Sequence, residues 1–187
     1  VHHYGRLDVQ RTRSKGEAYY EMGIKKIGEL GDNIDAVCEL ALQAAELHRY
    51  DEAVDLWNRV IKENPVLPVA HLNQGYAYLK LDRFPQARDA SRRAKELDPS
   101  LKDAAYNEAL AELYDGHPAA AVSLLDHLVC RFPDYGVARY LFGVALYLSG
   151  RAEEGSAVLR GLRLANVDIV PSLARQINEL LHLGSRT

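Results

Sequence analysis

Histidine and cysteine are the residues of this chain best suited to bind a metal or to attack a substrate, but their spacing favours neither role. The histidines show no paired spacing of the kind that zinc sites use. No glycine-rich phosphate loop precedes a helix-forming stretch, and no serine or cysteine has a general base beside it in sequence. We therefore expect this chain alone to be non-catalytic and to need no cofactor or metal. The seven histidines are His2, His3, His48, His71, His117, His127 and His182.

The overall composition narrows the choice of partner and compartment. Hydrophobic residues make up 48% of the 187 residues and charged residues 26%, which is typical of a folded protein. A net charge of −3 argues against nucleic acid as a partner. No apolar run approaches the ~20 residues needed to cross a bilayer. Cys38 and Cys130 lie far apart, and we expect both to be reduced and buried, which predicts a cytoplasmic location.

The dominant pattern in the sequence is a period of 34 residues without gaps. One series of small residues recurs at Ala41, Gly75, Ala109 and Gly143. A second series recurs at Ala53, Ala87, Ala121 and Gly155. Prolines keep the same period at Pro65, Pro99 and Pro133. A looser series has Gly116, Gly150 and Gly184, with His48 and Asp82 in the earlier positions.

This period predicts helical hairpins. A turn-forming residue twice in each period leaves room for two helices of roughly 13 residues each. Two antiparallel helices approach closely only where their side chains are small, so the two small series mark the point where the helices cross. Pro85 and Pro118 stand at predicted helix starts, where a missing N–H costs nothing. The prolines that keep the period end the second helix of each hairpin.

The second repeat, residues 68–101, carries the fullest match to a known family. It contains Asn73, Gly75, Ala77, Tyr78, Phe84, Ala87, Ala94, Asp98 and Pro99 at the spacings of the tetratricopeptide repeat (TPR) signature. Residues 34–184 as a whole resemble this family. The resemblance implies an all-α fold, a right-handed superhelix of hairpins that acts as a protein–protein interaction scaffold.

The predicted organisation has four complete repeats between two incomplete ends. Residues 12–33 are expected to form an N-terminal helix, similar to a lone second helix of a preceding repeat. Residues 170–187 carry Leu173, Ile177, Leu180 and Leu181 at helical spacing, which predicts a half-repeat that caps the stack. The complete repeats are predicted at residues 34–67, 68–101, 102–135 and 136–169.

Residues 1–11 are expected to be extended and to end an upstream domain. The run His2-His3-Tyr4-Gly5, followed by a basic helix start and then TPR repeats, resembles the C-terminal part of bacterial family 2 glycosyltransferases. That resemblance implies that His3 would be a metal ligand only if an upstream catalytic domain exists. It also implies an alternative function, in which the repeats recruit the acceptor protein of a glycosyltransferase or mediate self-association.

In the TPR family, positions 2, 5, 9, 12 and 13 of each repeat line a concave groove, and we call these the inner-surface positions. In the first repeat they are Asp35, Cys38, Leu42, Ala45 and Glu46. In the second they are Val69, Leu72, Tyr76, Leu79 and Lys80. In the third they are Asp103, Tyr106, Leu110, Leu113 and Tyr114. In the fourth they are Val137, Tyr140, Val144, Tyr147 and Leu148.

This predicted groove is apolar and rich in tyrosine, with one lysine and no arginine. A bound carboxylate needs charge-assisted donors, so we do not expect an acidic peptide tail as partner. An apolar or amphipathic protein segment, helical or extended, fits better. The sequence is equally compatible with three other occupants of this groove: residues 12–30 of the chain itself, a neighbouring domain, or a second copy in a homo-oligomer.

Overall fold

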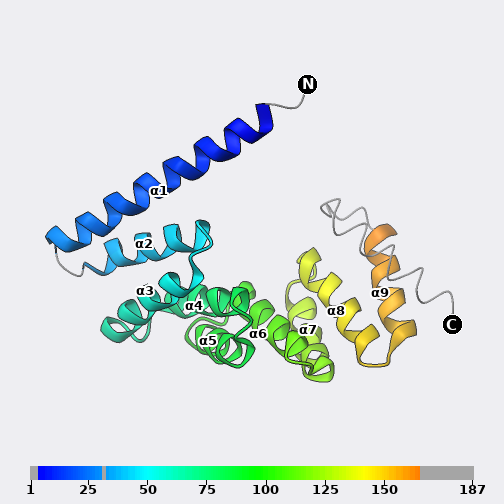
Figure 1. The fold of residues 1–187 in the computed structure, drawn as a ribbon. Helices are drawn as coiled ribbons and strands as arrows, with labels where there is room; N and C mark the ends of the chain where they lie inside the picture. The colour runs from blue at the N-terminus through cyan, green and yellow to red at the C-terminus, as the bar shows by residue number, and fades with distance from the viewer. Residues whose placement is uncertain (1–3, 31–32, 165–187) are drawn as a thin grey trace. The chain divides into compact units, whose positions relative to one another are not determined.

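The computed structural model describes residues 4–30 and 33–164, and all the regular structure in these ranges is α-helical. Figure 1 shows the helices in chain order. They are α1 (Tyr4–Leu30), α2 (Ile34–Glu46), α3 (Tyr50–Glu63), α4 (Pro68–Lys80), α5 (Phe84–Leu97), α6 (Lys102–Tyr114), α7 (Pro118–Arg131), α8 (Gly136–Leu148) and α9 (Ala152–Leu164). The predicted fold class, an all-α repeat protein of the solenoid type, is confirmed.

The chain divides into two compact units, Val1–Asp98 and Pro99–Thr187. In the first unit each helix packs on the next, from α1 to α5, and α2 also contacts α4. In the second unit α6, α7, α8 and α9 pack in the same order, and α6 also contacts α8. Each unit therefore contains two helical hairpins, α2–α3 and α4–α5 in the first, and α6–α7 and α8–α9 in the second.

Local sequence signals set the helix boundaries. The Asn33 side chain caps α2, because its Oδ1 accepts hydrogen bonds from the backbone N–H groups of Asp35 (2.9 Å) and Ala36 (3.4 Å). Proline occupies one of the first two positions of α4, α5 and α7, as Pro85 and Pro118 predicted for the last two. The second helices α3, α5 and α7 each end two residues before one of the periodic prolines.

The turn within each hairpin explains the looser periodic series. Gly116 and Gly150 have φ of 84° and 87°, and His48 and Asp82, in the equivalent positions, have φ of 60° and 55°. All four residues therefore adopt the left-handed conformation that allows a sharp turn after the first helix. Glycine adopts it at the lowest cost, which is why glycine fills the position twice.

The two series of small residues meet where the helices of a hairpin cross. Ala41 and Ala53 are fully buried in the first hairpin, as are Ala109 and Ala121 in the third. In the fourth hairpin a Cβ atom added to Gly155 would lie 2.6 Å from the backbone oxygen of Gly143. A larger residue on either side would hold the helices apart, so the repeat spacing directly specifies the packing.

Larger side chains fill the space around each crossing. In the first unit the core centres on Trp57, 1% exposed, with Leu40 and Val60 around it. In the second unit Leu125 and Leu146 take the equivalent role. Burial of apolar side chains on this scale is the main source of stability for each hairpin.

The structure corrects the prediction for residues 1–11. These residues were expected to be extended, but α1 begins at Tyr4 and continues to Leu30. No proline interrupts residues 4–30, so the helix predicted for residues 12–33 extends further toward the N-terminus. Within the first unit α1 packs along α2, as Figure 1 shows.

Two contacts anchor α1 to the first hairpin. The Tyr20 hydroxyl donates a 2.6 Å hydrogen bond to Oε2 of Glu52, and the Arg49 guanidinium lies over the Tyr20 ring. Burial and this hydrogen bond raise the pKa of Tyr20 to about 12. The comparison of residues 12–33 with a lone second helix agrees with this packing. The predicted capping segment, residues 170–187, lies outside the described residues.

Candidate functional site

The candidate site is the face of the first helices, α2 and α4 in one unit and α6 and α8 in the other, that carries the inner-surface positions. These positions recur with helical spacing and so follow one face of each helix. The opposite face carries the small residues of the crossing and packs on the second helix. The repeat therefore buries one face of each first helix and leaves the inner-surface positions on the other.

Exposure at the inner-surface positions follows the position within the repeat. Positions 2 and 13 are exposed in all four repeats, and position 5 is half-buried in all four. Position 9 is exposed in the first unit, at Leu42 and Tyr76, and half-buried in the second, at Leu110 and Val144. The predicted site residues Leu72, Tyr106 and Tyr140, all at position 5, thus contribute part of their side chains to this face.

The structure partly corrects the predicted site at position 12 of the repeat. Leu79 is only 7% exposed, so it supports the helix pair and presents no surface to a partner. At the same position Leu113 and Tyr147 are half-buried. Burial at position 12 therefore differs between repeats even where the residue is leucine in both, as Leu79 and Leu113 show.

In the first unit the exposed face centres on Tyr76, which is 41% exposed. Its ring packs edge-on against Tyr50, with 6.4 Å between ring centroids. The Lys80 Nζ atom lies 5.3 Å from the Tyr76 centroid, a cation–π contact. The one cation among the inner-surface positions is therefore already engaged with an aromatic ring.

In the second unit several tyrosines gather around α6 and α8. Burial raises the pKa of the Tyr106 phenol, and the nearby phenols of Tyr114 and Tyr140 raise it further. Tyr106 also packs against Tyr135, with 5.8 Å between ring centroids. Tyr135 donates a 2.5 Å hydrogen bond to Oδ1 of Asp103. The predicted site residue Tyr106 therefore lies near the phenols of Tyr114 and Tyr140, and its ring contacts that of Tyr135.

The helix α1 does not cover these positions. A Cβ added to Gly16 would meet Leu47, and one added to Gly23 would meet Leu40 and Gln43. These residues of α2 and its C-terminal end are not at inner-surface positions. Of the occupants left open by the sequence, residues 12–30 of the same chain are thus excluded for the first unit.

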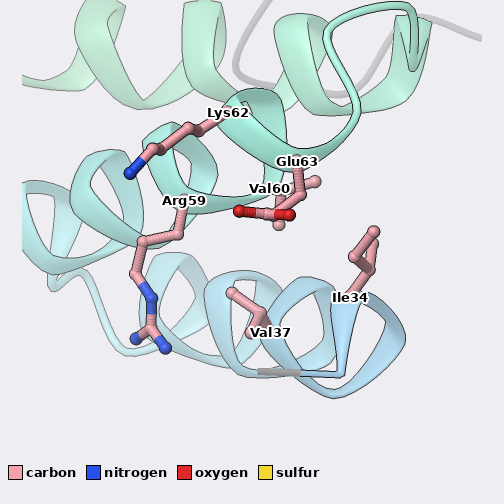
Figure 2. Close-up of a pocket in the computed structure, with 6 residues that line it drawn as sticks. All are labelled: Ile34, Val37, Arg59, Val60, Lys62 and Glu63. Atoms are coloured by element: carbon pink, nitrogen blue, oxygen red, sulfur yellow. The ribbon is translucent and has the colours of Figure 1, made fainter. Parts of the chain in front are cut away.

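A small cavity at the open end of the first hairpin was not predicted. Figure 2 shows it between the start of α2 and the end of α3, with Ile34, Val37 and Val60 on its apolar side and Arg59, Lys62 and Glu63 around it. Its volume is about 100 Å³. The sequence feature that accompanies this cavity is Val37, which is smaller than His71 at the equivalent position of the second repeat. Ligand pockets usually measure about 300–1,000 Å³, so this cavity is too small for one.

The histidines and cysteines, which could in principle bind a metal or react, have structural roles or lie far from one another. His71 is buried, and its Nε2 lies 3.0 Å from the Pro65 carbonyl oxygen. Cys38 is half-buried, and burial and the Asp35 charge raise its pKa, which lowers its reactivity. Cys130 is exposed, contrary to the prediction that both cysteines are buried, and neither cysteine forms a disulfide. Among the described residues no three histidine, cysteine or acidic side chains converge as a metal site.

Two sequence profiles described as tetratricopeptide repeat match the chain, one over residues 38–101 and the other over residues 112–175. The chain belongs to the tetratricopeptide repeat family. The first match falls within the first two predicted repeats, and the second runs from the third repeat past the end of the fourth, to residue 175. As a TPR protein, the chain is a protein-interaction scaffold.

Solved TPR structures share this fold. The MamA protein superposes with a TM-score of 0.74 and 19% identity over 83% of this chain and 85% of that chain. A thermophilic TPR protein from Thermus thermophilus gives a TM-score of 0.70 and 18% identity over 94% and 96%. YrrB, a TPR protein with an unusual peptide-binding site, superposes with a TM-score of 0.66 and 17% identity over 79% of this chain and 76% of that chain. No curated protein matches the sequence.

None of these matches supports an origin in a glycosyltransferase. The resemblance to glycosyltransferases depended on a strand at residues 1–4, whereas the structure has a helix that begins at Tyr4. His3, its expected metal ligand, lies outside the described residues. No helix in the described ranges is long and apolar enough to cross a membrane.

Proposed function

We propose that this TPR protein binds an apolar or amphipathic protein segment on the inner-surface positions of its first helices. One observation carries the proposal. Outside α1, every large hydrophobic side chain found exposed in the described residues lies at an inner-surface position, with the single exception of Val66. These side chains are Leu42, Val69, Tyr76, Tyr114, Val137 and Leu148. Within each unit, exposed apolar side chains at these positions favour association, because burying them removes apolar surface from water.

The tyrosines make this face suitable for a protein segment in particular. Tyrosine offers a large rigid ring with a polar tip and loses little conformational entropy on binding. In the second unit the pKa values of Tyr106 and Tyr135 are raised, so both phenols stay neutral hydrogen-bond donors at physiological pH. The similarity to YrrB, a TPR protein with a peptide-binding site, supports a peptide-like ligand for this chain as well.

Charge argues against an acidic partner. The inner-surface positions contain Asp35, Glu46 and Asp103 but only one cation, Lys80, which contacts Tyr76. A carboxylate held on this face would lack the charge-assisted donors that such recognition needs. An apolar segment with neutral or basic flanks avoids that cost.

A peptide library tests this proposal directly. Peptides selected on the wild-type chain would be labelled, and their affinity measured by fluorescence anisotropy. The double variant Tyr76→Ser/Tyr114→Ser removes two exposed rings, and aromatic anchors at interfaces commonly contribute about 2 kcal/mol or more, so we expect affinity to fall at least about tenfold.

The matched control is Tyr19→Ser, which removes an equally exposed tyrosine from α1, outside the inner surface. It should bind the selected peptides as the wild type does. Equal affinity for the double variant and the wild type, with both folded by circular dichroism, would show that partners bind elsewhere.

A further inference from the structure

Acidic side chains follow the exposed face of α2, the first helix of the first hairpin. The sequence of α2 contains Asp35, Glu39 and Glu46, but no lysine, arginine or histidine. All three acidic residues are exposed, and so is Leu42, which lies between Glu39 and Glu46. The spacing of four, three and four residues places these side chains on one face of the helix. We call this row of carboxylates the acidic stripe.

Exposed apolar side chains lie next to the acidic stripe. Val69 and Tyr76, at inner-surface positions of α4, are 48% and 41% exposed. Leu42, within the acidic stripe itself, is 46% exposed. Because α2 and α4 contact each other within the first unit, their inner-surface positions are neighbours. The inner surface of this unit therefore combines an apolar strip with a row of carboxylates.

The acidic stripe has few cations of its own. Among the described residues no cation forms an ion pair with Asp35 or Glu46. Lys80 is the one cation at an inner-surface position, and its Nζ atom lies 5.3 Å from the centroid of the Tyr76 ring. A cationic side chain from a partner would therefore meet carboxylates that the chain itself leaves without a counter-charge.

The helix α3 of the same hairpin differs from α2 in what surrounds its charges. It carries the exposed acidic side chains Asp55 and Glu63, but none of the large hydrophobic side chains described in α3 is exposed. Negative charge on α3 thus borders polar surface alone. On α2 it borders apolar side chains, whose burial by a partner would stabilise a complex.

We infer that the inner surface of the first unit binds an amphipathic helix that carries lysine or arginine along one edge of its apolar stripe. This inference rests on the proposed function and specifies the charge and conformation of the partner. The apolar stripe of the partner packs on Leu42, Val69 and Tyr76, and its basic edge lies along the acidic stripe.

The spacing of the acidic stripe favours a helical partner. Glu39 and Glu46 follow Asp35 by four and eleven residues, so their carboxylates recur along α2 with the period of a helix. A partner helix lying along α2 presents lysine or arginine at the same intervals. The carboxylates also repel nucleic-acid phosphates and anionic lipid headgroups, which leaves a protein segment as the partner.

Three synthetic helical peptides test the charge of the partner. They share one apolar stripe and differ only along one edge, which holds lysine, glutamine or glutamate. Fluorescence anisotropy measures their affinity for the full chain. Two exposed ion pairs together change affinity about two- to thirtyfold, so we expect the lysine probe to bind tighter than the glutamine probe by that factor. The glutamate probe should bind most weakly, and the differences should shrink at about 0.5 M salt.

Two double variants locate the charge effect. Asp35→Asn/Glu46→Gln removes two charges from the acidic stripe, and the matched control Asp55→Asn/Glu63→Gln removes two charges from α3. All four residues are exposed, so both variants should remain folded, which circular dichroism verifies. The first variant should narrow the difference in affinity between the lysine and glutamine probes. The control should leave that difference as it is in the wild type.

Several results would overturn the inference: equal affinity for the three probes, tightest binding of the glutamate probe, or the same narrowing in both double variants. A lysine probe with a central proline, which interrupts a helix, should bind at least about tenfold more weakly, and equal binding would exclude the helical partner.

The proposed function is tested apart from the charge of the partner. If the three probes bind equally but Tyr76→Ser weakens all of them, the inference fails and the proposed function stands. If Tyr76→Ser leaves every probe unaffected, the probes bind away from the inner surface and both fail. A chain that binds none of the probes overturns the inference, and the peptide selection then decides the proposed function.

Discussion

Replacing Gly155 with alanine tests the link between repeat period and helix packing. Gly155 lies in α9, and a Cβ added there would be 2.6 Å from the Gly143 backbone oxygen and 2.9 Å from the Tyr147 backbone nitrogen. Both neighbours are backbone atoms, so the clash is relieved only if α8 and α9 move apart. Such overpacking typically costs about 1–3 kcal/mol.

Gly161 in the same helix provides the matched control. A Cβ added to Gly161 meets no atom within 4 Å. Gly161→Ala should therefore stabilise the chain by about 0.5–1 kcal/mol, through the lower conformational entropy of the unfolded state. Because both changes are glycine to alanine in one helix, the difference between the two variants isolates the overpacking cost.

Thermal unfolding followed by circular dichroism measures this difference. For a chain of this size, about 1 kcal/mol shifts Tm by about 2–4 °C, so Gly155→Ala should melt about 2–12 °C below Gly161→Ala. If Gly155→Ala melts at or above Gly161→Ala, the helices do not approach closely at Gly155, and the packing inferred from the 34-residue period is wrong.

Three further predictions concern other parts of the repeat. Ala87→Leu, at a fully buried crossing, should lower stability by about 1–3 kcal/mol in a urea or thermal melt, and an unchanged curve would count against the register. Asp82→Gly should raise Tm, since it relieves a left-handed residue with φ of 55°, and a lower Tm would contradict the turn geometry. The pKa of Tyr20 is raised from 10.0 to about 12 in the folded chain, so the stabilisation from its neutral phenol should be complete below about pH 10 and lost as the pH rises to about 12. Between these two pH values the free energy of unfolding of Tyr20→Phe, measured by urea unfolding at each pH, should therefore change less than that of the wild type.

The sequence predicted the hairpins because their packing depends on residue size at fixed positions. A close helix crossing admits only small side chains, so Ala87 and Gly143 had to recur with the length of the unit. The turn position was harder to identify, since His48 and Asp82 are not glycine. Their positive φ angles show that the same backbone conformation recurs even where the residue type does not.

Other features depended on contacts that no periodicity reveals. Residues 4–11 are helical because nothing in them ends a helix, although the short run from Val1 to Gly5 suggested a strand. Leu79 is buried and Tyr76 is exposed, even though both lie at predicted groove positions. Burial at such positions depends on how neighbouring helices pack at the edge of each pair, which hydrophobicity alone does not specify.

These features connect the repeat to its function. Close crossings hold one face of each first helix against the second helix, and this fixes which side chains remain exposed. The apolar residues left on the other face, such as Tyr76 and Tyr114, cannot all be explained by packing within the units. A surface specified in this way by the fold is suited to bind a partner without a conformational change.

Photo-crosslinking to a selected peptide tests most directly whether the first helices bind the partner. A benzophenone amino acid would replace Tyr76 or Tyr114 on the first helices, and Asp55 or His127, both exposed, on the second helices α3 and α7. We expect crosslinks from Tyr76 and Tyr114 and none from Asp55 and His127. Crosslinks from the second-helix positions alone would contradict it.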